Sequence, residues 1–394
     1  MKNDQTLSIE YIDSDDRLQE YLQSITPTDL LALDTEFLRE KSYYPKLCLL
    51  QMATRESLAI IDPLASLDLE RLKPILLDPG VVKVFHAGEQ DLGILFSIIG
   101  EPVTPVFDTQ IASQLFGLPQ QIGLAALVHE FTGVRLKKID SFSDWSIRPL
   151  KDAQMHYAAD DVRYLPQVYQ QMVDALDCTG RLHWLESDFL RLSDISHYVV
   201  DEDRLWRRLK GNSHLSLRQI GVLREIAIWR EHTAQKRNQP RQWVLNDEML
   251  IDIARRCPKT EDELFSTRGL ATRINKKSVG ELLEAVQRGL TMDEADLPHH
   301  ENLVPRHNEM PGIYEACMSL VHLRASEQKV TAAALTNSKE LRALIGGQRQ
   351  GLPLLDGWRY EMVGRELLSF LEGNLAMSVD HGQIEVTDRG QTRH

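Results

Sequence analysis

Two carboxylates separated by one residue close an apolar run near the start of the chain. Asp34 and Glu36 lie near the end of the sequence LLALDTEF (30–37), whose length and apolar content predict a buried strand. Alternate residues of a strand point to the same face, so the two carboxylates are expected side by side. Such anions repel one another unless a cation lies between them, and carboxylate oxygens suit Mg²⁺ or Mn²⁺. The pair indicates a divalent-metal site, although many strands simply end in acidic residues.

A second acidic motif lies in HAGEQDLGIL (86–95). His86 ends a strand pattern, Gly88 permits a turn, and Asp91 opens a helix. An acidic residue at a helix N-terminus is also favoured by the helix dipole alone. Asp91 by itself therefore does not distinguish a ligand from a helix-stabilising residue.

A third motif lies in the helical pattern DAQMHYAADDVRYL (152–165). Tyr157 and Asp161 are four residues apart and share one helix face, so a phenol and a carboxylate can meet a common ligand. Asp160, three residues from Tyr157, is a rival that helix geometry does not exclude. Tyr157 is equally compatible with a partly buried core position.

The elements that must position these residues alternate between strand and helix patterns over roughly the first 200 residues. Short apolar runs with turn residues at their borders occupy 30–37, 47–53, 58–64 and 81–88, and helical patterns lie near 91–99, 109–117, 123–131 and 151–175. The first three runs follow each other closely, as in an antiparallel meander. This order predicts an α/β domain, residues 1–203, built on a mixed sheet.

Helical patterns alone continue after about residue 205. Ser216 with Gln219, and Thr260 with Glu263, form helix-capping boxes, and Asn246 can cap DEMLIDIARR. We therefore predict a compact all-α domain over 204–290. A linker that contains prolines and has no hydrophobic periodicity follows at 291–311, and its histidines are expected to be solvated. The sequence of residues 312–380 resembles that of the helical domain, which indicates a second copy in degraded form. We therefore predict that one or two small helical domains follow the α/β domain.

Composition and charge restrict the class of protein. No run of 18 apolar residues occurs and the N-terminus is polar, which predicts neither a membrane span nor a signal peptide. The four cysteines are far apart, as expected of thiols in a reducing cytoplasm. Net charge is −13, yet residues 204–290 carry 18 Lys and Arg against 10 Asp and Glu. An acidic domain that binds metal beside a basic domain that binds phosphates fits this division, as does a solvated basic face.

Taken together, the three acidic motifs resemble the DEDD superfamily of 3′→5′ exonucleases, and Tyr-x-x-x-Asp resembles its tyrosine subclass. DTEFLRE, HAGEQDL, FDTQIA, SDWSIRPL and YAADDVRYL resemble the ribonuclease D family, and LREIAIWRE, WVLNDEML and RGL resemble its helicase-and-RNase-D C-terminal (HRDC) domain. The resemblance covers about residues 28–290. It implies a ribonuclease H-like exonuclease fold at 1–203, an HRDC-type nucleic-acid-binding domain at 204–290, and a second, degraded HRDC-like copy at 312–380.

The same resemblance implies a two-metal mechanism. The residues that it assigns to catalysis are Asp34, Glu36, Asp91, Tyr157 and Asp161, and all but Tyr157 would bind two divalent ions, Mg²⁺ or Mn²⁺. The Tyr-x-x-x-Asp spacing selects Asp161 over Asp160, and Tyr157 would orient the attacking water. The implied activity is a 3′→5′ exoribonuclease that releases nucleoside 5′-monophosphates from single-stranded 3′ ends of structured RNA, such as tRNA precursors. A cytoplasmic monomer is expected.

Nucleic-acid contacts are assigned by residue type and by nearness to these motifs. The candidates near the metal site are Phe37, Arg39, Tyr44, His86 and Arg148, and those in the basic domain are Arg207, Arg208, Lys236 and Arg237. Tyr44 and Phe37 can stack on terminal bases, although core packing accounts for such residues equally well. Asp108 is predicted to cap the helix that follows it, and Arg148, with Asp144 and Trp145, also fits a brace beside the site.

Two other functions remain open at this stage. A DNA 3′→5′ exonuclease of repair type would use the same carboxylates, although no GxxxxGK[ST] motif of a helicase accompanies them. A non-catalytic RNA-binding scaffold would have no need of mutually repelling carboxylates.

Overall fold

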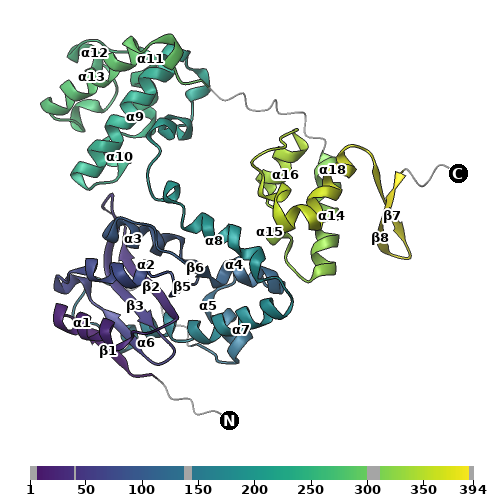
Figure 1. The fold of residues 1–394 in the computed structure, drawn as a ribbon. Coiled ribbons are helices and arrows are strands. Elements are labelled where there is room, and N and C mark those ends of the chain that lie inside the picture. Colours follow the sequence, from purple (N-terminus) through teal and green to yellow (C-terminus); the bar gives the residue numbers. More distant parts are fainter. Residues whose placement is uncertain (1–6, 40, 137–143, 300–310, 390–394) are drawn as a thin grey trace.

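The computed structural model describes residues 7–39, 41–136, 144–299 and 311–389. Its N-terminal domain is built on a six-stranded mixed sheet in the order β1-β4-β3-β2-β5-β6 (Figure 1). The strands are β1 (Ile9–Ile12), β2 (Leu30–Leu38), β3 (Lys46–Ala53), β4 (Leu58–Ile61), β5 (Val82–Phe85) and β6 (Val106–Asp108). The predicted α/β class is confirmed.

The central strands follow the predicted antiparallel meander. β3 pairs antiparallel with both β2 and β4, while β5 and β6 extend the sheet in parallel beyond β2. The short edge strands β1 and β6, of four and three residues, were not predicted.

Helices cover both faces of this sheet. They are α1 (Asp15–Ser24), α2 (Lys73–Leu77), α3 (Glu89–Ile99), α4 (Thr109–Ser113), α5 (Leu124–Thr132), α6 (Asp152–Arg163), α7 (Leu165–Cys178) and α8 (Glu186–Leu192). Leu31 and Leu33 of β2 belong to the core under α1 and α3, whereas Leu30 and Ala32 belong to the core with α5, α6 and α7. By alternation, Asp34 and Glu36 lie on the α6 face.

The predicted helix over 151–175 is two helices. α6 ends at Arg163 and α7 begins at Leu165, with Pro166 in its first turn. A proline has no N–H to donate to the carbonyl four residues earlier, and its ring clashes with that carbonyl. Pro166 therefore breaks the helix.

The next body is all-helical and has its own core. Its helices are α9 (Leu217–Arg237), α10 (Arg241–Val244), α11 (Asp247–Arg256), α12 (Glu261–Phe265) and α13 (Lys276–Thr291). The predicted capping box at Ser216 and Gln219 is present, and Asn246 and Thr260 accept from the backbone of their helices. These three predictions of helix starts are confirmed. The second predicted capping box is incomplete, because the Glu263 side chain accepts from the backbone N–H of Lys259 and not from that of Thr260.

The C-terminal helices share the core of the N-terminal domain. They comprise α14 (Pro311–Gln328), α15 (Ala332–Leu335), α16 (Ser338–Ile345), α17 (Gly357–Arg359) and α18 (Arg365–Leu371). Trp358 stacks on Trp184, with ring centroids 4.6 Å apart, and its indole N–H donates to the Trp184 carbonyl. Arg359 also pairs with the buried Asp188 at 2.6 Å. Trp358 therefore fixes this body to the exonuclease domain.

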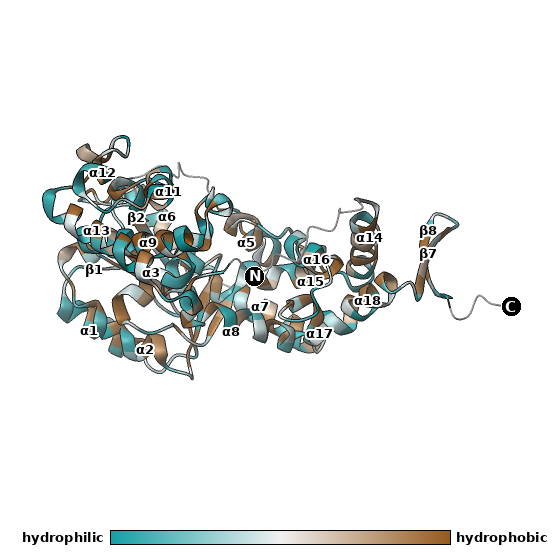
Figure 2. Cartoon of the chain, turned by 90° about the horizontal axis from the view of Figure 1, so that it is seen from above, coloured by the Kyte–Doolittle hydropathy of each residue, from teal (hydrophilic) through white to brown (hydrophobic). Residues whose placement is uncertain are grey.

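A hairpin that was not predicted follows α18. β7 (Leu375–Asp380) pairs with β8 (Gln383–Asp388), and Figure 2 shows it projecting from the end of the C-terminal helices. Its two-residue turn, His381-Gly382, has positive φ at both positions, as a tight hairpin requires. Residues 312–380 are therefore not purely helical.

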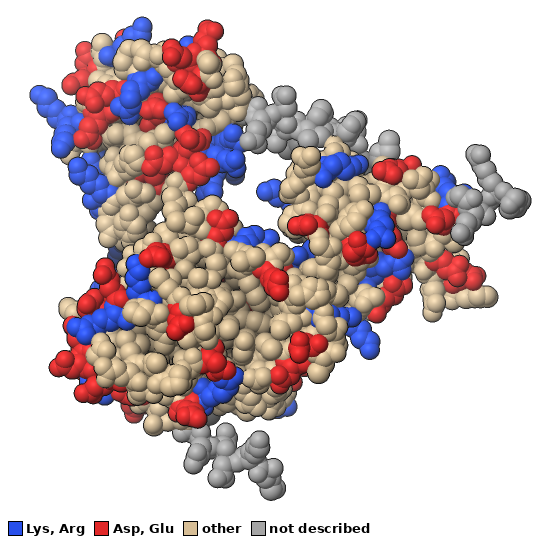
Figure 3. Space-filling model, viewed as in Figure 1, with Lys and Arg blue, Asp and Glu red and all other residues tan. Residues whose placement is uncertain are grey.

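Figure 3 shows an open space bounded by the N-terminal domain, the α9–α13 body and the C-terminal helices, with Lys and Arg among the side chains at its rim. Residues 300–310, most of the predicted linker, lie outside the described residues; the linker's described part includes a short 3-10 turn, Glu294–Asp296. In the described part of the chain, no helix is both long and apolar enough to cross a membrane.

Candidate active site

Strand β2 and helix α6 bring three carboxylates together. One carboxylate oxygen from each of Asp34, Glu36 and Asp161 lies within 4.8 Å of the other two. We call these three residues the acidic cluster. A bulge in the β2–β3 pairing follows Glu36, so the regular ladder is interrupted beside the cluster.

Asp160 and Asp161 have different environments, although they are adjacent on α6. Asp160 accepts from the Nε of Arg163 at 3.0 Å, and Arg163 also donates to the carbonyl of Leu7, which precedes the edge strand β1. Asp161 instead belongs to the acidic cluster. The structure therefore distinguishes the two aspartates, which helix geometry alone did not.

Asp91 approaches from the other face of the sheet and is buried. The Thr35 hydroxyl donates to its Oδ1. Thr35, between the two carboxylates of β2, points to the α3 face by strand alternation. Asp91 thus stands beside the acidic cluster, held by a residue that the sequence analysis did not single out.

The turn that presents Asp91 is fixed by Asp108. This carboxylate accepts from the backbone N–H of Gly88 at 2.8 Å and, as predicted, caps the helix that follows it. A Cβ at position 88 would lie 2.5 Å from the Cβ of Phe85, so the glycine permits close packing. The positive φ of the turn is at Ala87, not at Gly88.

Burial and mutual repulsion raise the pKa values in the cluster. Burial, followed by the charges of Asp91, Asp161 and Glu36, raises the pKa of Asp34 well above its ordinary value. The pKa of Glu36 is raised to about 8, first by burial and then by Asp161 and Asp91. The pKa of Asp161 is raised to about 7, first by burial and then by Asp160 and Asp91. Uncompensated carboxylates of this kind fit hard divalent cations.

Tyr157 lies one helical turn before Asp161 and packs against Trp145, with ring centroids 6.0 Å apart. Burial, followed by the carboxylates of the cluster, raises its pKa well above 10. The phenol therefore stays protonated at neutral pH and can donate or accept a hydrogen bond beside the cluster.

A brace holds the segment that carries Trp145. Arg148 donates through Nε and Nη2 to Asp62 at 2.6 and 2.7 Å, and through its remaining donors to the carbonyls of Cys48, Trp145 and Ile147. All five guanidinium N–H groups are thus used within the protein. A phosphate contact by Arg148 would require some of these bonds to break.

Comparison with known proteins identifies the family. A 3′-5′ exonuclease model matches residues 9–177, and an HRDC domain model matches residues 219–286. Ribonuclease D of Sphingobium indicum is 37% identical over 374 residues, covering 94% of this chain and 96% of that protein. Ribonuclease D of Zymomonas mobilis is 36% identical over 370 residues, covering 92% and 94%. The chain belongs to the ribonuclease D family.

A solved structure agrees with this assignment. Escherichia coli RNase D, described as an exoribonuclease involved in structured RNA processing, has 31% identity and a TM-score of 0.78, covering 93% of this chain and 99% of that one. The resemblance predicted from the motifs is confirmed, as is the prediction of a nuclease with a 3′-5′ exonuclease domain. All five residues predicted to be catalytic lie within the range that matches the exonuclease model.

The remaining candidates near the ribonuclease D site differ in accessibility. Arg39 is exposed, Phe37 is half-buried, and Tyr44 has 47% of its surface exposed. His86 is held by Thr109 and the Ile122 carbonyl, each 3.0 Å from a ring nitrogen. Burial lowers its pKa despite the nearby Asp108. Its nucleotide contact stays a prediction.

The four candidates predicted in the basic helical region form two groups. Arg207 and Arg208 lie on a 3-10 helix (Glu202–Arg208) whose Asp203 pairs with Arg224 in the middle of α9. Lys236 and Arg237 are exposed at the C-terminus of α9. The second group lies beside the loop that follows β2, because the side chain of Asn238 accepts from the backbone N–H of Tyr43 and Tyr44 at 3.1 Å each.

Proposed function

We propose that this protein is a 3′→5′ exoribonuclease that removes nucleotides one at a time, as 5′-monophosphates, from single-stranded 3′ ends of structured RNA such as tRNA precursors. The observation that carries the proposal is the acidic cluster beside Asp91 and Tyr157 in a member of the ribonuclease D family. The description of the Escherichia coli relative supports structured RNA as the substrate. We also infer that the protein acts as a cytoplasmic monomer.

The carboxylates fit a metal site by their chemistry. Asp34, Glu36, Asp91 and Asp161 would hold two divalent ions, Mg²⁺ or Mn²⁺. Bound divalent ions neutralise charge on the attacking and leaving oxygens of phosphodiester hydrolysis. Thr35 keeps the Asp91 carboxylate in place, and the protonated Tyr157 hydroxyl orients the water that attacks the terminal phosphodiester.

The domain division that accompanies this proposal is an exonuclease domain at 1–203, an HRDC domain at 204–290, a linker at 291–311 and a degraded HRDC-like copy at 312–380. The order of helices supports the repeat, since a long helix, a short helix and an Asn-capped helix occur in both α9–α11 and α14–α16. Asn337 caps α16 as Asn246 caps α11.

The test compares RNA and DNA oligomers of identical sequence, labelled at either end, with Mg²⁺, Mn²⁺ or EDTA. We expect 5′-labelled RNA to shorten by single nucleotides with metal only, 3′-labelled RNA to release its label at once, and DNA to react more slowly. Faster hydrolysis of DNA would favour the repair exonuclease. Tight RNA binding without any metal-dependent cleavage would favour the non-catalytic scaffold.

A further inference from the structure

One surface of the HRDC domain combines positive charge with an exposed aromatic residue. The segments 236–243 and 268–277 together contain seven Lys and Arg and no Asp or Glu. Packing brings them together: Arg237 donates to Ser278 at 2.5 Å, and Arg273 donates to the carbonyls of Gln242 and Trp243 at 3.2 and 3.4 Å.

The positive side chains of this surface are available to solvent. Arg273, Lys276 and Lys277 are exposed, as are Lys236 and Arg237. Trp243 differs from the other two tryptophans of the domain, because half of its surface is exposed while Trp206 and Trp229 are buried. An exposed indole among cations is a typical stacking platform for single-stranded bases.

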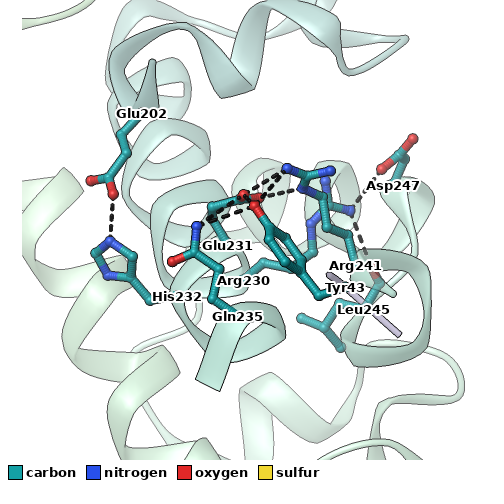
Figure 4. Close-up of polar contacts among 9 residues, drawn as sticks. All are labelled: Tyr43, Glu202, Arg230, Glu231, His232, Gln235, Arg241, Leu245 and Asp247. Carbon is teal, nitrogen blue, oxygen red and sulfur yellow. Dashed lines mark hydrogen bonds and ion pairs between the residues drawn. The ribbon is translucent and has the colours of Figure 1, made fainter. Parts of the chain in front are cut away.

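A hydrogen-bonded group of Tyr43, Glu231, Gln235 and Arg241, which we call the latch, joins the loop after β2 to α9 and to α10, the helix that carries Trp243. Tyr43, in the loop after β2, donates to the buried Glu231 of α9, and Gln235 and Arg241 donate to the Tyr43 hydroxyl at 3.1 Å (Figure 4). Arg241 also lies over the Tyr43 ring, 4.9 Å from its centroid, and pairs with Glu231. The strand that carries Asp34 and Glu36, β2, is therefore followed within a few residues by Tyr43, which contacts the HRDC domain.

The latch has no net charge that could attract RNA phosphates. Burial opposes ionisation of Glu231, but its bonds from Arg241 and Tyr43 outweigh burial and keep the pKa of Glu231 low. Arg241 is thus neutralised by Glu231, and the cations that remain for a phosphate backbone are those on either side of the latch. Tyr44, half-exposed beside Asn238, lies at the junction of the two domains.

We infer that the surface formed by Trp243, Arg273, Lys276 and Lys277 binds the single-stranded RNA that leads into the active site, with a base stacked on Trp243. This inference rests on the proposed function and extends it, because it names the path of the strand upstream of the scissile bond. The occupant is single-stranded RNA, since phosphates pair with the cations and an unpaired base is needed to stack on the indole.

The experiment uses the full-length protein and two RNA substrates, a trinucleotide and a long unstructured oligomer. Trp243→Ala should weaken binding of the long oligomer about tenfold, as expected for loss of one stacked base. Trp243→Phe should restore most of the affinity and Trp243→Leu should not. Hydrolysis of the trinucleotide should be unchanged in all three variants.

A charge variant tests the phosphate contacts separately. Replacing Arg273, Lys276 and Lys277 with Gln should reduce the slope of log affinity against log salt by about 2 for single-stranded RNA. The matched control replaces three exposed cations elsewhere on the domain, Lys210, Arg255 and Lys259, and should leave most of the slope intact.

The outcomes separate this inference from the proposed function. An equal reduction of the salt-dependence slope in both charge variants would overturn the inference, as would wild-type affinity of Trp243→Ala for the long oligomer. Failure of the wild-type protein to cleave even the trinucleotide with Mg²⁺ would overturn the proposed function instead.

Discussion

The Thr35 hydroxyl donates a hydrogen bond to the Asp91 carboxylate from the face of β2 opposite to Asp34 and Glu36. One strand therefore supplies two carboxylates on one face and the support for a third on the other. Because Asp91 comes from α3 and the first two from β2, this bond fixes one element of the site relative to another.

Loss of this hydroxyl should loosen Asp91 without removing a ligand. Thr35→Val, which has the same shape, should weaken metal binding and reduce turnover by about 10- to 100-fold, as is usual for residues that support a ligand. Mn²⁺ titration and turnover measure both effects. Thr35→Ser keeps the hydroxyl and should retain near-normal values, so equal defects in Thr35→Val and Thr35→Ser would contradict this role.

Tyr157→Phe should lower the rate of hydrolysis by about 10²-fold or more, since positioning and acid–base groups contribute on that scale. Metal affinity should stay near that of the wild type, because the phenol orients water and is no ligand. Calorimetry with Mn²⁺ and single-turnover kinetics separate the two effects. A collapse of metal affinity in this variant would show that the hydroxyl holds the cation.

The sequence predicted the carboxylates but not all of their surroundings. Strand and helix periodicity placed Asp34 with Glu36 and Tyr157 with Asp161, because these pairs are local. The i, i+3 spacing of Asp160 and Arg163 is itself a local sign that these two side chains pair. Thr35 carried no signal, since its partner lies 56 residues away.

Contacts between domains had no signal in a single sequence either. Tyr43 meets Glu231 across 188 residues, and Trp358 meets Trp184 across 174. The sequence predicted residues 312–380 only as a degraded copy of the helical domain and did not name what that copy contacts. The stacking of Trp358 on Trp184 joins the copy to the exonuclease domain.

Trp358→Ala should therefore destabilise the protein by about 2 kcal/mol, because it removes a stacked, half-buried aromatic and a hydrogen bond. Thermal or urea unfolding measures the change. Trp243→Ala, at a residue with half of its surface exposed, is the matched control and should leave stability within about 0.5 kcal/mol. A larger loss in the control than in Trp358→Ala would reverse the assignment.

The acidic cluster also predicts how stability depends on pH. The pKa values of Glu36 and Asp161 are raised from 4.5 and 3.8 to about 8 and about 7, so the folded protein binds more protons than the unfolded chain between these limits. Stability in EDTA should fall as pH rises from about 5 to 8. Mg²⁺ should oppose this loss, so the Tm difference between Mg²⁺ and EDTA should widen with pH. A Tm difference that does not change with pH would contradict the raised pKa values of Glu36 and Asp161.

The most direct test of the metal site compares two adjacent, chemically identical substitutions, Asp161→Asn and Asp160→Asn. Mn²⁺ binding by calorimetry and cleavage of 5′-labelled RNA are measured in both, after circular dichroism has shown that both are folded. We predict that Asp161→Asn abolishes metal-dependent cleavage and weakens Mn²⁺ binding, whereas Asp160→Asn keeps both, because Asp160 is paired with Arg163 away from the cluster. Cleavage retained in Asp161→Asn, or lost in Asp160→Asn alone, would contradict the account.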